Sequence, residues 1–305
     1  MTDIIVAGGG TAGLTAAIYA RRAGKSVILI EKESTGGQIV YSPRIENYPG
    51  LPGISGTDYA DILTKQAESL GVSIEYAVIQ SFSADGDIIT ASCDTGDVQG
   101  RALVLALGTS HRRLELEKEE DLTGCGISYC AVCDGAFYEG KEAAVLGGGS
   151  TALTDALFLS GICKNVTLIH RRDEFRGEAA LAAKLREKQN VRFLLSSTVT
   201  GLLEEGNELS GIQVKDLKSS LVRTLPVSGL FIAIGQDPQT DICRGFVDTD
   251  DAGYLIAGED CLTSRKGVFA AGDCRTKSVR QLATAAGDGA AAGLAASRYV
   301  ESLST

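Results

Sequence analysis

Short runs of consecutive apolar residues alternate along the chain with longer segments in which small and apolar residues recur at helical spacing. The run at residues 3–7 is followed by a helical pattern over residues 14–23 and by a second apolar run over residues 26–30. Uninterrupted apolar runs are typical of strands buried in a parallel sheet, and a helix between two such strands makes a βαβ unit. The chain therefore begins with a predicted βαβ unit.

The same arrangement recurs in the middle of the chain. Apolar runs at residues 143–146 and 166–169 flank a helical pattern over residues 153–160. Three further strands and a small-faced C-terminal helix are predicted, at residues 102–106, 230–234, 267–273 and 284–299. This recurrence predicts the α/β class, with two Rossmann-like, three-layer dinucleotide-binding domains. An acidic stretch at residues 115–121 is the expected crossover between them.

A glycine-rich turn, GGGTAG at residues 8–13, separates the first strand from the first helix, and Glu31 follows 18 residues after Gly13. Such glycines let the backbone approach a pyrophosphate, and a carboxylate at about this offset binds a ribose hydroxyl. The alternative is a plain tight turn. The residues predicted to hold the first dinucleotide are Gly8, Gly10, Thr11, Ala12, Gly13 and Glu31.

The second βαβ unit carries an equivalent turn, GGGSTA at residues 147–152, but basic residues replace the acid after its second strand. Arginine forks bind a ribose 2′-phosphate, which a carboxylate would repel. The site is therefore predicted to prefer NADPH, with a solvated basic turn as the alternative. The residues predicted to hold NADPH are Gly147, Gly149, Ser150, Thr151, Ala152, His170, Arg171, Arg172 and, if its loop begins a helix, Arg176.

Composition narrows the function classes. The chain has 305 residues, enough for two domains, and its 37 glycines with only 5 prolines indicate backbone geometry rather than linkers. With 29 Lys and Arg against 39 Asp and Glu, the net charge of −10 disfavours nucleic acid. No apolar run approaches the ~18 residues of a membrane span, and no basic leader precedes the first strand. We therefore expect a cytoplasmic protein without a membrane partner.

Two of the eight cysteines are separated by two residues, in CAVCD at residues 130–134. This spacing lets both sulfurs lie on one turn, so the pair can alternate between dithiol and disulfide. An inert pair and a zinc half-site are the alternatives, but zinc needs further clustered cysteines or histidines. We predict that Cys130 and Cys133 form a redox pair, with Asp134 as an acid–base group or a turn cap. We expect no metal, and six core thiols that include Cys125.

Two dinucleotide sites and a dithiol in one chain imply an electron relay. Nicotinamide transfers a hydride whereas disulfides exchange through thiolates, and a flavin is the usual intermediary between them. We therefore assign FAD to the first site. Electrons are expected to pass from NADPH to the flavin, then to the Cys130–Cys133 disulfide and an external disulfide. Asp273, beside a glycine after a short strand, suits the hydroxyls of a cofactor chain, or is a turn aspartate.

In their order and spacing, these motifs resemble the bacterial-type, low-molecular-weight thioredoxin reductases over essentially the whole chain. The segments that carry the resemblance are GGGTAG at 8–13, GGQ at 36–38, ENYPG at 46–50, CAVCDG at 130–135, GGGSTA at 147–152, HRRDEFR at 170–176, GVFAAGD at 267–273 and RQLATAAGDG from Arg280.

The resemblance implies an FAD domain from residues 1–113 and 244–305, with an NADPH domain of residues 114–243 inserted. It implies that Cys133 lies against the flavin, that Cys130 attacks thioredoxin, and that Asp134 donates a proton. The enzyme would be a homodimer whose NADPH domain rotates, and its C-terminal helix would point its N-terminus at the flavin. The residues implied around the flavin are Gly36, Gly37, Gln38, Asn47, Asp273, Arg280 and Gln281.

Three departures from the family pattern fall in or near the nicotinamide domain. Leu107 replaces a threonine after the third strand, residues 236–240 replace an aromatic-or-histidine PNT motif, and an acidic pair is reduced to Thr154 and Asp155. These changes bear on the affinity for the reductant more than on the dithiol chemistry.

Other functions remain open at this point. A relative could use ferredoxin as reductant, although such relatives generally lose the HRR pattern, which is intact here. It could also reduce another redox protein or act as a dithiol oxidase with oxygen. From another class, the chain could be a flavin-binding scaffold or a redox-sensing interaction module without turnover. The Cys130 and Cys133 pair argues against this class, because a mere binder has no use for an exchangeable disulfide beside a flavin.

Overall fold

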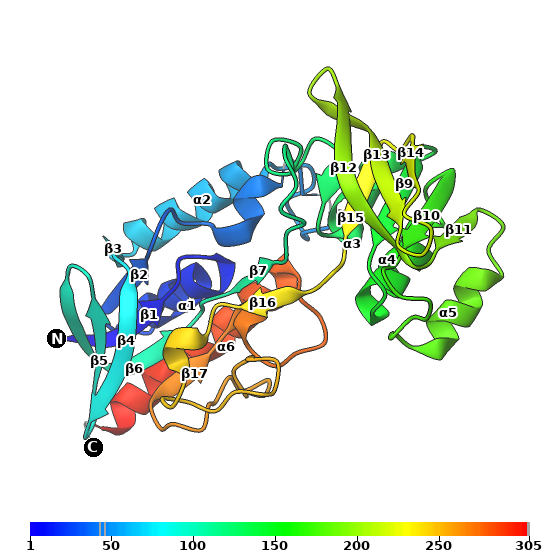
Figure 1. Ribbon diagram of the computed structural model, residues 1–305. Coiled ribbons are helices and arrows are strands. Elements are labelled where there is room, and N and C mark those ends of the chain that lie inside the picture. The colour runs from blue at the N-terminus through cyan, green and yellow to red at the C-terminus, as the bar shows by residue number, and fades with distance from the viewer. Residues whose placement is uncertain (43, 46, 304–305) are drawn as a thin grey trace. The chain divides into compact units, whose positions relative to one another are not determined.

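A computed structural model describes residues 1–42, 44–45 and 47–303, and its chain folds into two compact units (Figure 1). Unit 1 comprises Met1–Pro43, Tyr48–Ser110 and Asp237–Thr305. Unit 2 comprises Arg44–Asn47 and His111–Gln236, and so lies almost entirely within the sequence of unit 1.

Unit 1 is built on a seven-stranded sheet with strand order β3-β2-β1-β6-β5-β4, in which β17 also pairs with β6. The pairs formed by β1, β2, β3, β6 and β17 are parallel, whereas β4 and β5 extend the sheet as antiparallel strands. The strands are β1 Thr2–Ala7, β2 Val27–Glu31, β3 Ser73–Tyr76, β4 Ile79–Asp85, β5 Ile88–Cys93, β6 Gly96–Leu105 and β17 Val268–Ala270. The helices and 3-10 turns are α1 Thr11–Arg22, η1 Gly37–Tyr41, α2 Gly56–Ser69, η3 Asp241–Cys243, η4 Gly272–Cys274 and α6 Leu282–Ser302.

The first and last helices of unit 1 pack directly on each other. Glycines at 289 and 293 of α6 face the backbone of α1, where a Cβ on Gly293 would lie 3.1 Å from the carbonyl carbon and Cα of Ala16. Beneath them, Val6 stands opposite Leu29 and Val104 in the sheet and is fully buried. The apolar run predicted to form the first strand is thus the centre of this core, as expected for a strand buried on both faces.

Unit 2 contains a five-stranded parallel sheet with strand order β11-β10-β9-β15-β8, and a separate antiparallel sheet of β12, β13 and β14. Its strands are β8 Ile127–Ser128, β9 Glu142–Leu146, β10 Asn165–Ile169, β11 Val191–Leu194, β12 Ser197–Glu205, β13 Glu208–Asp216, β14 Val222–Leu225 and β15 Gly229–Ile232. Its helices and turn are α3 Ala131–Asp134, η2 Gly135–Tyr138, α4 Ser150–Leu159 and α5 Ala179–Arg186. The predicted α/β class is confirmed; the three-stranded antiparallel sheet is an addition that the sequence analysis missed.

The chain crosses between the units at β7 (Thr109–His111) and β16 (Gln236–Pro238), which pair as a two-stranded sheet. The two compact units therefore divide at 110/111 and 236/237, three and seven residues before the expected boundaries at 113/114 and 243/244. The acidic stretch at residues 115–121 belongs to unit 2 instead of forming the crossover. Its Glu119 is buried, and its carboxylate accepts hydrogen bonds from the Leu114 and Leu116 N–H groups and the Tyr129 hydroxyl. These bonds replace those that the carboxylate would make to water.

The contact of α1 with α6 predicts opposite effects for one substitution at two positions of the same helix. A Cβ added at Gly287 would meet no atom of the described residues within 4 Å, so Gly287→Ala should raise the free energy of unfolding by about 0.5–1 kcal/mol through helix propensity. At Gly293 the added methyl group would overlap the backbone of Ala16, so Gly293→Ala should lower it by about 1–3 kcal/mol. Urea unfolding of the ligand-free chain measures both. A shift of the same sign for the two variants would contradict the proposed packing.

Candidate functional site

The first glycine turn lies at the carboxyl end of β1 and leads into α1. Gly8 has a φ of +104°, and Gly10 is the N-cap of α1 without a side-chain cap bond, which leaves the first-turn N–H groups of the helix available to a ligand. Glu31, the last residue of β2, accepts a hydrogen bond of 2.6 Å from the Gly9 N–H through Oε2. The structure thus brings Glu31 beside the turn, as the sequence predicted.

The GGQ segment lies against this turn. The Gly36 N–H donates to the Gly9 carbonyl at 2.8 Å, and a Cβ on Gly37 would lie 3.3 Å from the Cα of Gly10. Gln38 is exposed at the start of η1, and Asn47 is exposed in the part of the predicted ENYPG segment that is described. Glu46 of that segment lies outside the described residues.

Asp273 joins the same region from the far end of the sequence. It lies on η4 after Gly272, whose backbone approaches Ala12 so closely that a Cβ there would be 2.8 Å from the Ala12 side chain. The Oδ1 atom of Asp273 is buried, and no partner for it is found among the described residues. Burial raises the pKa of this carboxyl group. A buried acceptor left without a donor fits a ligand that brings a hydroxyl group, so these residues fit a dinucleotide cofactor.

Arg280 and Gln281, also predicted around the cofactor, have identifiable structural roles. The Arg280 guanidinium donates to the carbonyls of Asp273 at 3.2 Å and Arg275 at 3.3 Å, and lies 4.2 Å from the ring centroid of Tyr254. Gln281 is the N-cap of α6 and forms a reciprocal capping box with Thr284. Both side chains therefore help to shape the Asp273 loop and the start of α6.

The second glycine turn, in unit 2, repeats the geometry of the first. Gly147 has a φ of +153°, and Gly149 caps α4 without a side-chain bond. The Arg176 N–H donates to the Gly148 carbonyl at 2.8 Å, and the Glu178 N–H to the Ser150 hydroxyl at 3.2 Å. The segment that follows β10 is therefore held against the turn.

His170 does not contribute the positive charge that the sequence analysis expected. Its ring is buried and stacks on Phe175 with 5.7 Å between ring centroids. Burial lowers its pKa, and the charges of Arg176 and its neighbours lower it further, so the ring is neutral at pH 7. The exposed side chains of Arg171, Arg172 and Arg176 carry the charge instead. Residues 171–178 form no helix, and α5 begins at Ala179. The condition under which Arg176 was expected to join the site, a helix starting in its loop, is therefore not met.

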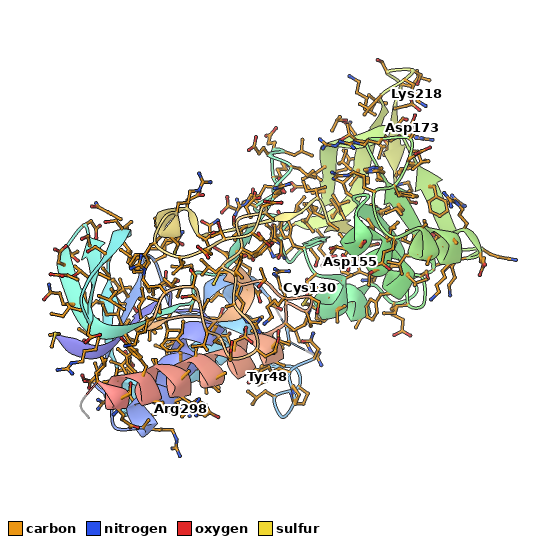
Figure 2. The ribbon with its side chains drawn as sticks, turned by 90° about the horizontal axis from the view of Figure 1, so that it is seen from below. Tyr48, Cys130, Asp155, Asp173, Lys218 and Arg298 are labelled. Carbon is orange, nitrogen blue, oxygen red and sulfur yellow. A yellow bond between two sulfur atoms is a disulfide. The ribbon has the colours of Figure 1, made fainter. Side chains whose placement is uncertain are left out.

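Cys130 and Cys133 form a disulfide, with their Cα atoms 5.3 Å apart. Cys130 is the N-cap of the short helix α3, and both cysteines are half-buried. Figure 2 shows Cys130 on unit 2. Within the described ranges, no cluster of three His, Cys, Asp or Glu residues is placed to hold a metal ion. The pairing that the spacing predicted is confirmed.

Asp134 follows the disulfide, and its carboxyl group lies in a half-buried environment. Its Oδ2 accepts a hydrogen bond of 2.6 Å from the Ser128 hydroxyl, whereas its buried Oδ1 has no partner in the described part of the chain. Burial raises the pKa of Asp134, and the bond from Ser128 opposes that shift. A carboxyl group with a raised pKa and a free oxygen suits a proton donor.

Ser128 contacts both the disulfide segment and the acid, which the sequence analysis did not anticipate. Besides its bond to Asp134, its oxygen accepts from the Cys130 N–H at 3.0 Å, so one side chain orients both the disulfide and the acid. It is buried at the end of β8, a two-residue strand. No motif marks a lone serine two residues before a cysteine, and only the folded strand shows its role.

The remaining cysteines divide into two groups. Cys93, Cys163, Cys243, Cys261 and Cys274 are buried free thiols, as expected. Cys125 is exposed, and its prediction as a core thiol is wrong. It lies between Gly124 and Gly126, both with positive φ, in a surface turn that precedes β8.

One departure from the family pattern has a local explanation. The Gln236 amide lies 3.2 Å from His111 Nδ1, across the paired strands β7 and β16. The His111 ring stacks on Tyr129 at 4.8 Å, and burial lowers its pKa to about 4. The glutamine at this position therefore bonds to a neutral histidine.

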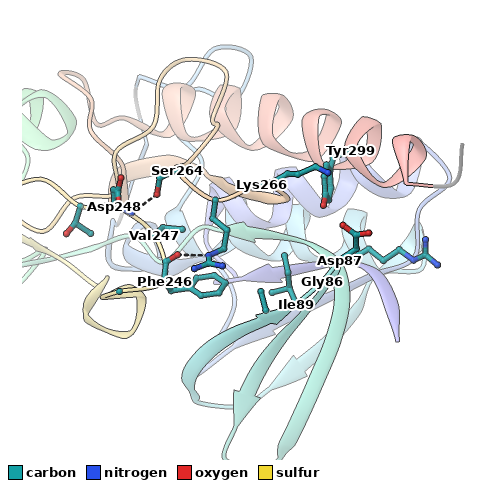
Figure 3. Close-up of a pocket in the computed structure, with 14 residues that line it drawn as sticks. Gly86, Asp87, Ile89, Phe246, Val247, Asp248, Ser264, Lys266 and Tyr299 are labelled. Carbon is teal, nitrogen blue, oxygen red and sulfur yellow. Dashed lines mark hydrogen bonds between the residues drawn. The ribbon is translucent and has the colours of Figure 1, made fainter.

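A surface pocket of about 790 Å³ lies elsewhere in unit 1 and contains none of the predicted site residues (Figure 3). Phe246, Arg265, Lys266 and Tyr299 line it, and two of these form a cation–π contact of 4.5 Å between Arg265 and the Phe246 ring.

Known proteins match this arrangement. The model of the family described as pyridine nucleotide-disulphide oxidoreductase matches residues 2–290. The chain belongs to this family. A thioredoxin reductase of Listeria monocytogenes is 38% identical to this oxidoreductase over 301 residues, which cover 99% of the chain and 94% of the relative.

Solved structures agree with this assignment. The crystal structure of thioredoxin reductase from Streptococcus pyogenes is 36% identical and superposes on this oxidoreductase with a TM-score of 0.95 over 99% of both chains. Thioredoxin reductase from Giardia duodenalis is 33% identical, with a TM-score of 0.93 over 98% of this chain and 99% of that chain. The predicted resemblance and the two Rossmann-like domains are confirmed, and family membership implies a flavin and a pyridine nucleotide. None of the helices that the structure describes is long and apolar enough to span a bilayer.

The acid on α4 predicts a pH dependence of stability. Burial raises the pKa of Asp155 to about 7, from 3.8 for the free group. Between these values the folded protein holds a proton that the unfolded chain releases, so the free energy of unfolding falls as pH rises from about 4 to 7. Asp155→Asn removes this titration and should stabilise the protein by about 2 kcal/mol more at pH 8 than at pH 5.

Denaturant unfolding at the two pH values measures this difference. Asp173→Asn is the matched control, because its carboxylate is exposed and should show no such change between pH 5 and pH 8. An equal effect of Asp155→Asn at both pH values would show that its carboxyl group titrates normally.

Proposed function

We propose that this oxidoreductase is an NADPH-dependent thioredoxin reductase that contains FAD. The observation that carries the proposal is the Cys130–Cys133 disulfide beside Asp134, a carboxyl group with one buried, unbonded oxygen. The names of its relatives support thioredoxin as the substrate. Three alternative functions are less favoured: reduction by ferredoxin, action on another redox protein, and dithiol oxidation. The reason is that the arginines expected to bind the 2′-phosphate of NADPH are present.

FAD would be held in unit 1. The Gly8–Gly13 turn would bind its pyrophosphate, Glu31 a hydroxyl of its adenosine ribose, and Asp273 Oδ1 a hydroxyl of the chain that leads to the flavin. Gly36, Gly37, Gln38, Asn47, Arg280 and Gln281 would complete its surroundings. When bound, the flavin supplies the exchange between two-electron hydride transfer and thiol chemistry.

NADPH would be held in unit 2 by the Gly147–Ala152 turn. Arg171 and Arg172 would bind the 2′-phosphate, with Arg176 close by on the segment that is tied to Gly148. His170, being neutral, would contribute ring contact rather than charge.

The two cysteines, Asp134 and Ser128 would each have a different role in the thiol–disulfide exchange. Two electrons and two protons convert the disulfide to two thiols. The Cys130 thiolate then attacks the substrate disulfide, one substrate sulfur leaves as a thiolate, and Cys133 displaces the other, which restores the Cys130–Cys133 bond. Asp134 would give a proton to the departing sulfur from Oδ1 while Ser128 holds its Oδ2.

We further propose the domain division implied by the resemblance, with an FAD domain of residues 1–113 and 244–305 and an NADPH domain of residues 114–243. A homodimer and a cytoplasmic location accompany this proposal. They rest on the resemblance to the bacterial-type thioredoxin reductases.

The main test uses the purified full chain. We expect a yellow protein that NADPH bleaches and that reduces thioredoxin, with activity lost in both Cys130→Ser and Cys133→Ser. Cys125→Ser is the matched control and should retain full turnover, because this exposed thiol lies outside the dithiol pair. Unaltered thioredoxin reduction by Cys133→Ser would refute the electron path.

The coenzyme preference gives a separate prediction. Each charge-assisted contact to a phosphate is worth ~1.5–3 kcal/mol, so Arg171→Ala combined with Arg172→Ala should raise the KM for NADPH at least ~10-fold while that for NADH changes little. Arg223→Ala, on the separate antiparallel sheet, should alter neither value. Equal losses for the two coenzymes would exclude the 2′-phosphate role.

A further inference from the structure

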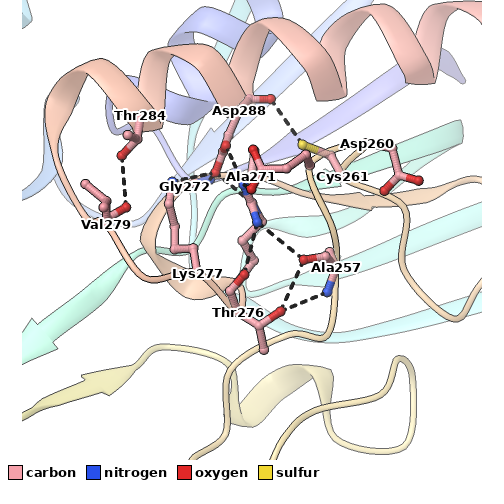
Figure 4. A network of polar contacts seen from close by, with 12 residues as sticks. Ala257, Asp260, Cys261, Ala271, Gly272, Thr276, Lys277, Val279, Thr284 and Asp288 are labelled. Carbon is pink, nitrogen blue, oxygen red and sulfur yellow. Dashed lines mark hydrogen bonds and ion pairs between the residues drawn. The ribbon is translucent and has the colours of Figure 1, made fainter.

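A buried ionic cluster lies next to η4, the turn of unit 1 that carries Gly272 and Asp273 (Figure 4). Its centre is the Asp288 carboxylate on α6, which accepts a two-pronged contact of 2.8 Å from each of Arg275 Nε and Nη2. Lys277 Nζ lies 2.8 Å from the same carboxylate. The side chains of these three residues are only 2–7% exposed, so the charges are paired almost out of contact with water.

The cluster is attached to the backbone of the Asp273 turn. The Gly272 N–H donates to Asp288 Oδ2 at 2.9 Å, and the side chain of Arg275 binds the same carboxylate two residues after Asp273. Asp288 thus holds the backbone immediately before Asp273 and the side chain shortly after it. Arg280 also donates hydrogen bonds to the carbonyls of Asp273 and Arg275. The backbone of the turn is therefore held at Gly272, Asp273 and Arg275.

Charge balance also links the cluster to Asp273. Arg275 and Lys277 bring two positive charges to the buried carboxylate of Asp288. Arg275 also lies 3.2 Å from Glu259, whose side chain is 93% exposed to water. Burial raises the pKa of Asp273, the charges of Lys277 and Arg280 lower it, and the charge of Asp288 adds a smaller rise. Lys277 thus contacts the Asp288 carboxylate and also favours the ionised form of Asp273, in which the unbonded Oδ1 accepts a hydroxyl proton most strongly.

From this geometry we propose that Asp288 is a positioning residue for flavin binding, which holds Asp273 Oδ1 where a cofactor hydroxyl reaches it. This inference rests on the proposed assignment of FAD to unit 1. Asp288 would act through the turn, because four protein donors already hold its carboxylate. Its effect is confined to the half of the cofactor that Asp273 meets, whereas the adenosine half depends on Glu31 and the glycine turn.

The test measures two dissociation constants on the full chain freed of flavin. FAD binding is followed by quenching of flavin fluorescence, and ADP is measured as a competitor of FAD, so that only the FAD site is reported. Asp288→Asn should weaken FAD binding at least about 10-fold through loss of the charge-assisted bonds, while the ADP constant changes less than about 2-fold. Equal losses for FAD and ADP would mean a general loosening of unit 1 and would overturn the proposal.

A second variant keeps the test decisive if Asp288→Asn does not fold. Arg275→Lys retains the buried positive charge but loses the two-pronged contact, so it should show the same selective loss of FAD with a smaller magnitude. Glu259→Gln is the matched control, because it removes an exposed carboxylate from the same arginine and should leave both constants unchanged. Wild-type affinity for FAD in Arg275→Lys would overturn the proposal, whereas failure of the wild-type chain to bind FAD would overturn the flavin assignment itself.

Discussion

The close approach of α1 and α6 is the constraint on which the first site depends. These helices come from opposite ends of the sequence, and they meet because Gly289 and Gly293 have no side chain to separate them from the backbone of α1. Their contact brings the Gly272 turn within reach of Ala12, and so brings the carboxyl group of Asp273 to the glycine turn that follows β1. The proposed cofactor site is thus assembled from both ends of the chain because two methyl groups are absent from α6.

Buried carboxyl groups of this protein differ in how fully they are hydrogen-bonded. In unit 1 the buried Asp288 is fully satisfied by four donors, and such a saturated network fixes geometry. In unit 2 the carboxyl group of Asp134 is left with one oxygen unbonded beside an exchangeable disulfide. A satisfied carboxylate holds its neighbours in place, whereas an unsatisfied one has a raised pKa and is available for proton transfer.

Much of the fold was predictable because its signals are local. The apolar runs that form β1, β9 and β10 and the glycine turns that follow the first two each lie within a few consecutive residues. The antiparallel sheet of unit 2 was missed because its strands are partly exposed and lack a continuous apolar run. The exposed Cys125 was misassigned because composition describes the average cysteine and not its particular turn.

The sequence by itself determined the chemistry of this protein: a dithiol spaced for a disulfide, two glycine turns, and an arginine pair in place of a carboxylate. These are properties of residue type and spacing, which survive in any fold that keeps the segments intact. Only the tertiary structure decided the burial, the hydrogen-bond partners and the pKa of each group. It buried His170 and so lowered the pKa of its ring, placed Ser128 within hydrogen-bond distance of both Cys130 and Asp134, and enclosed Asp288 with two cations. Charge state depends on solvent and on neighbours distant in the chain, and neither is written in a local motif.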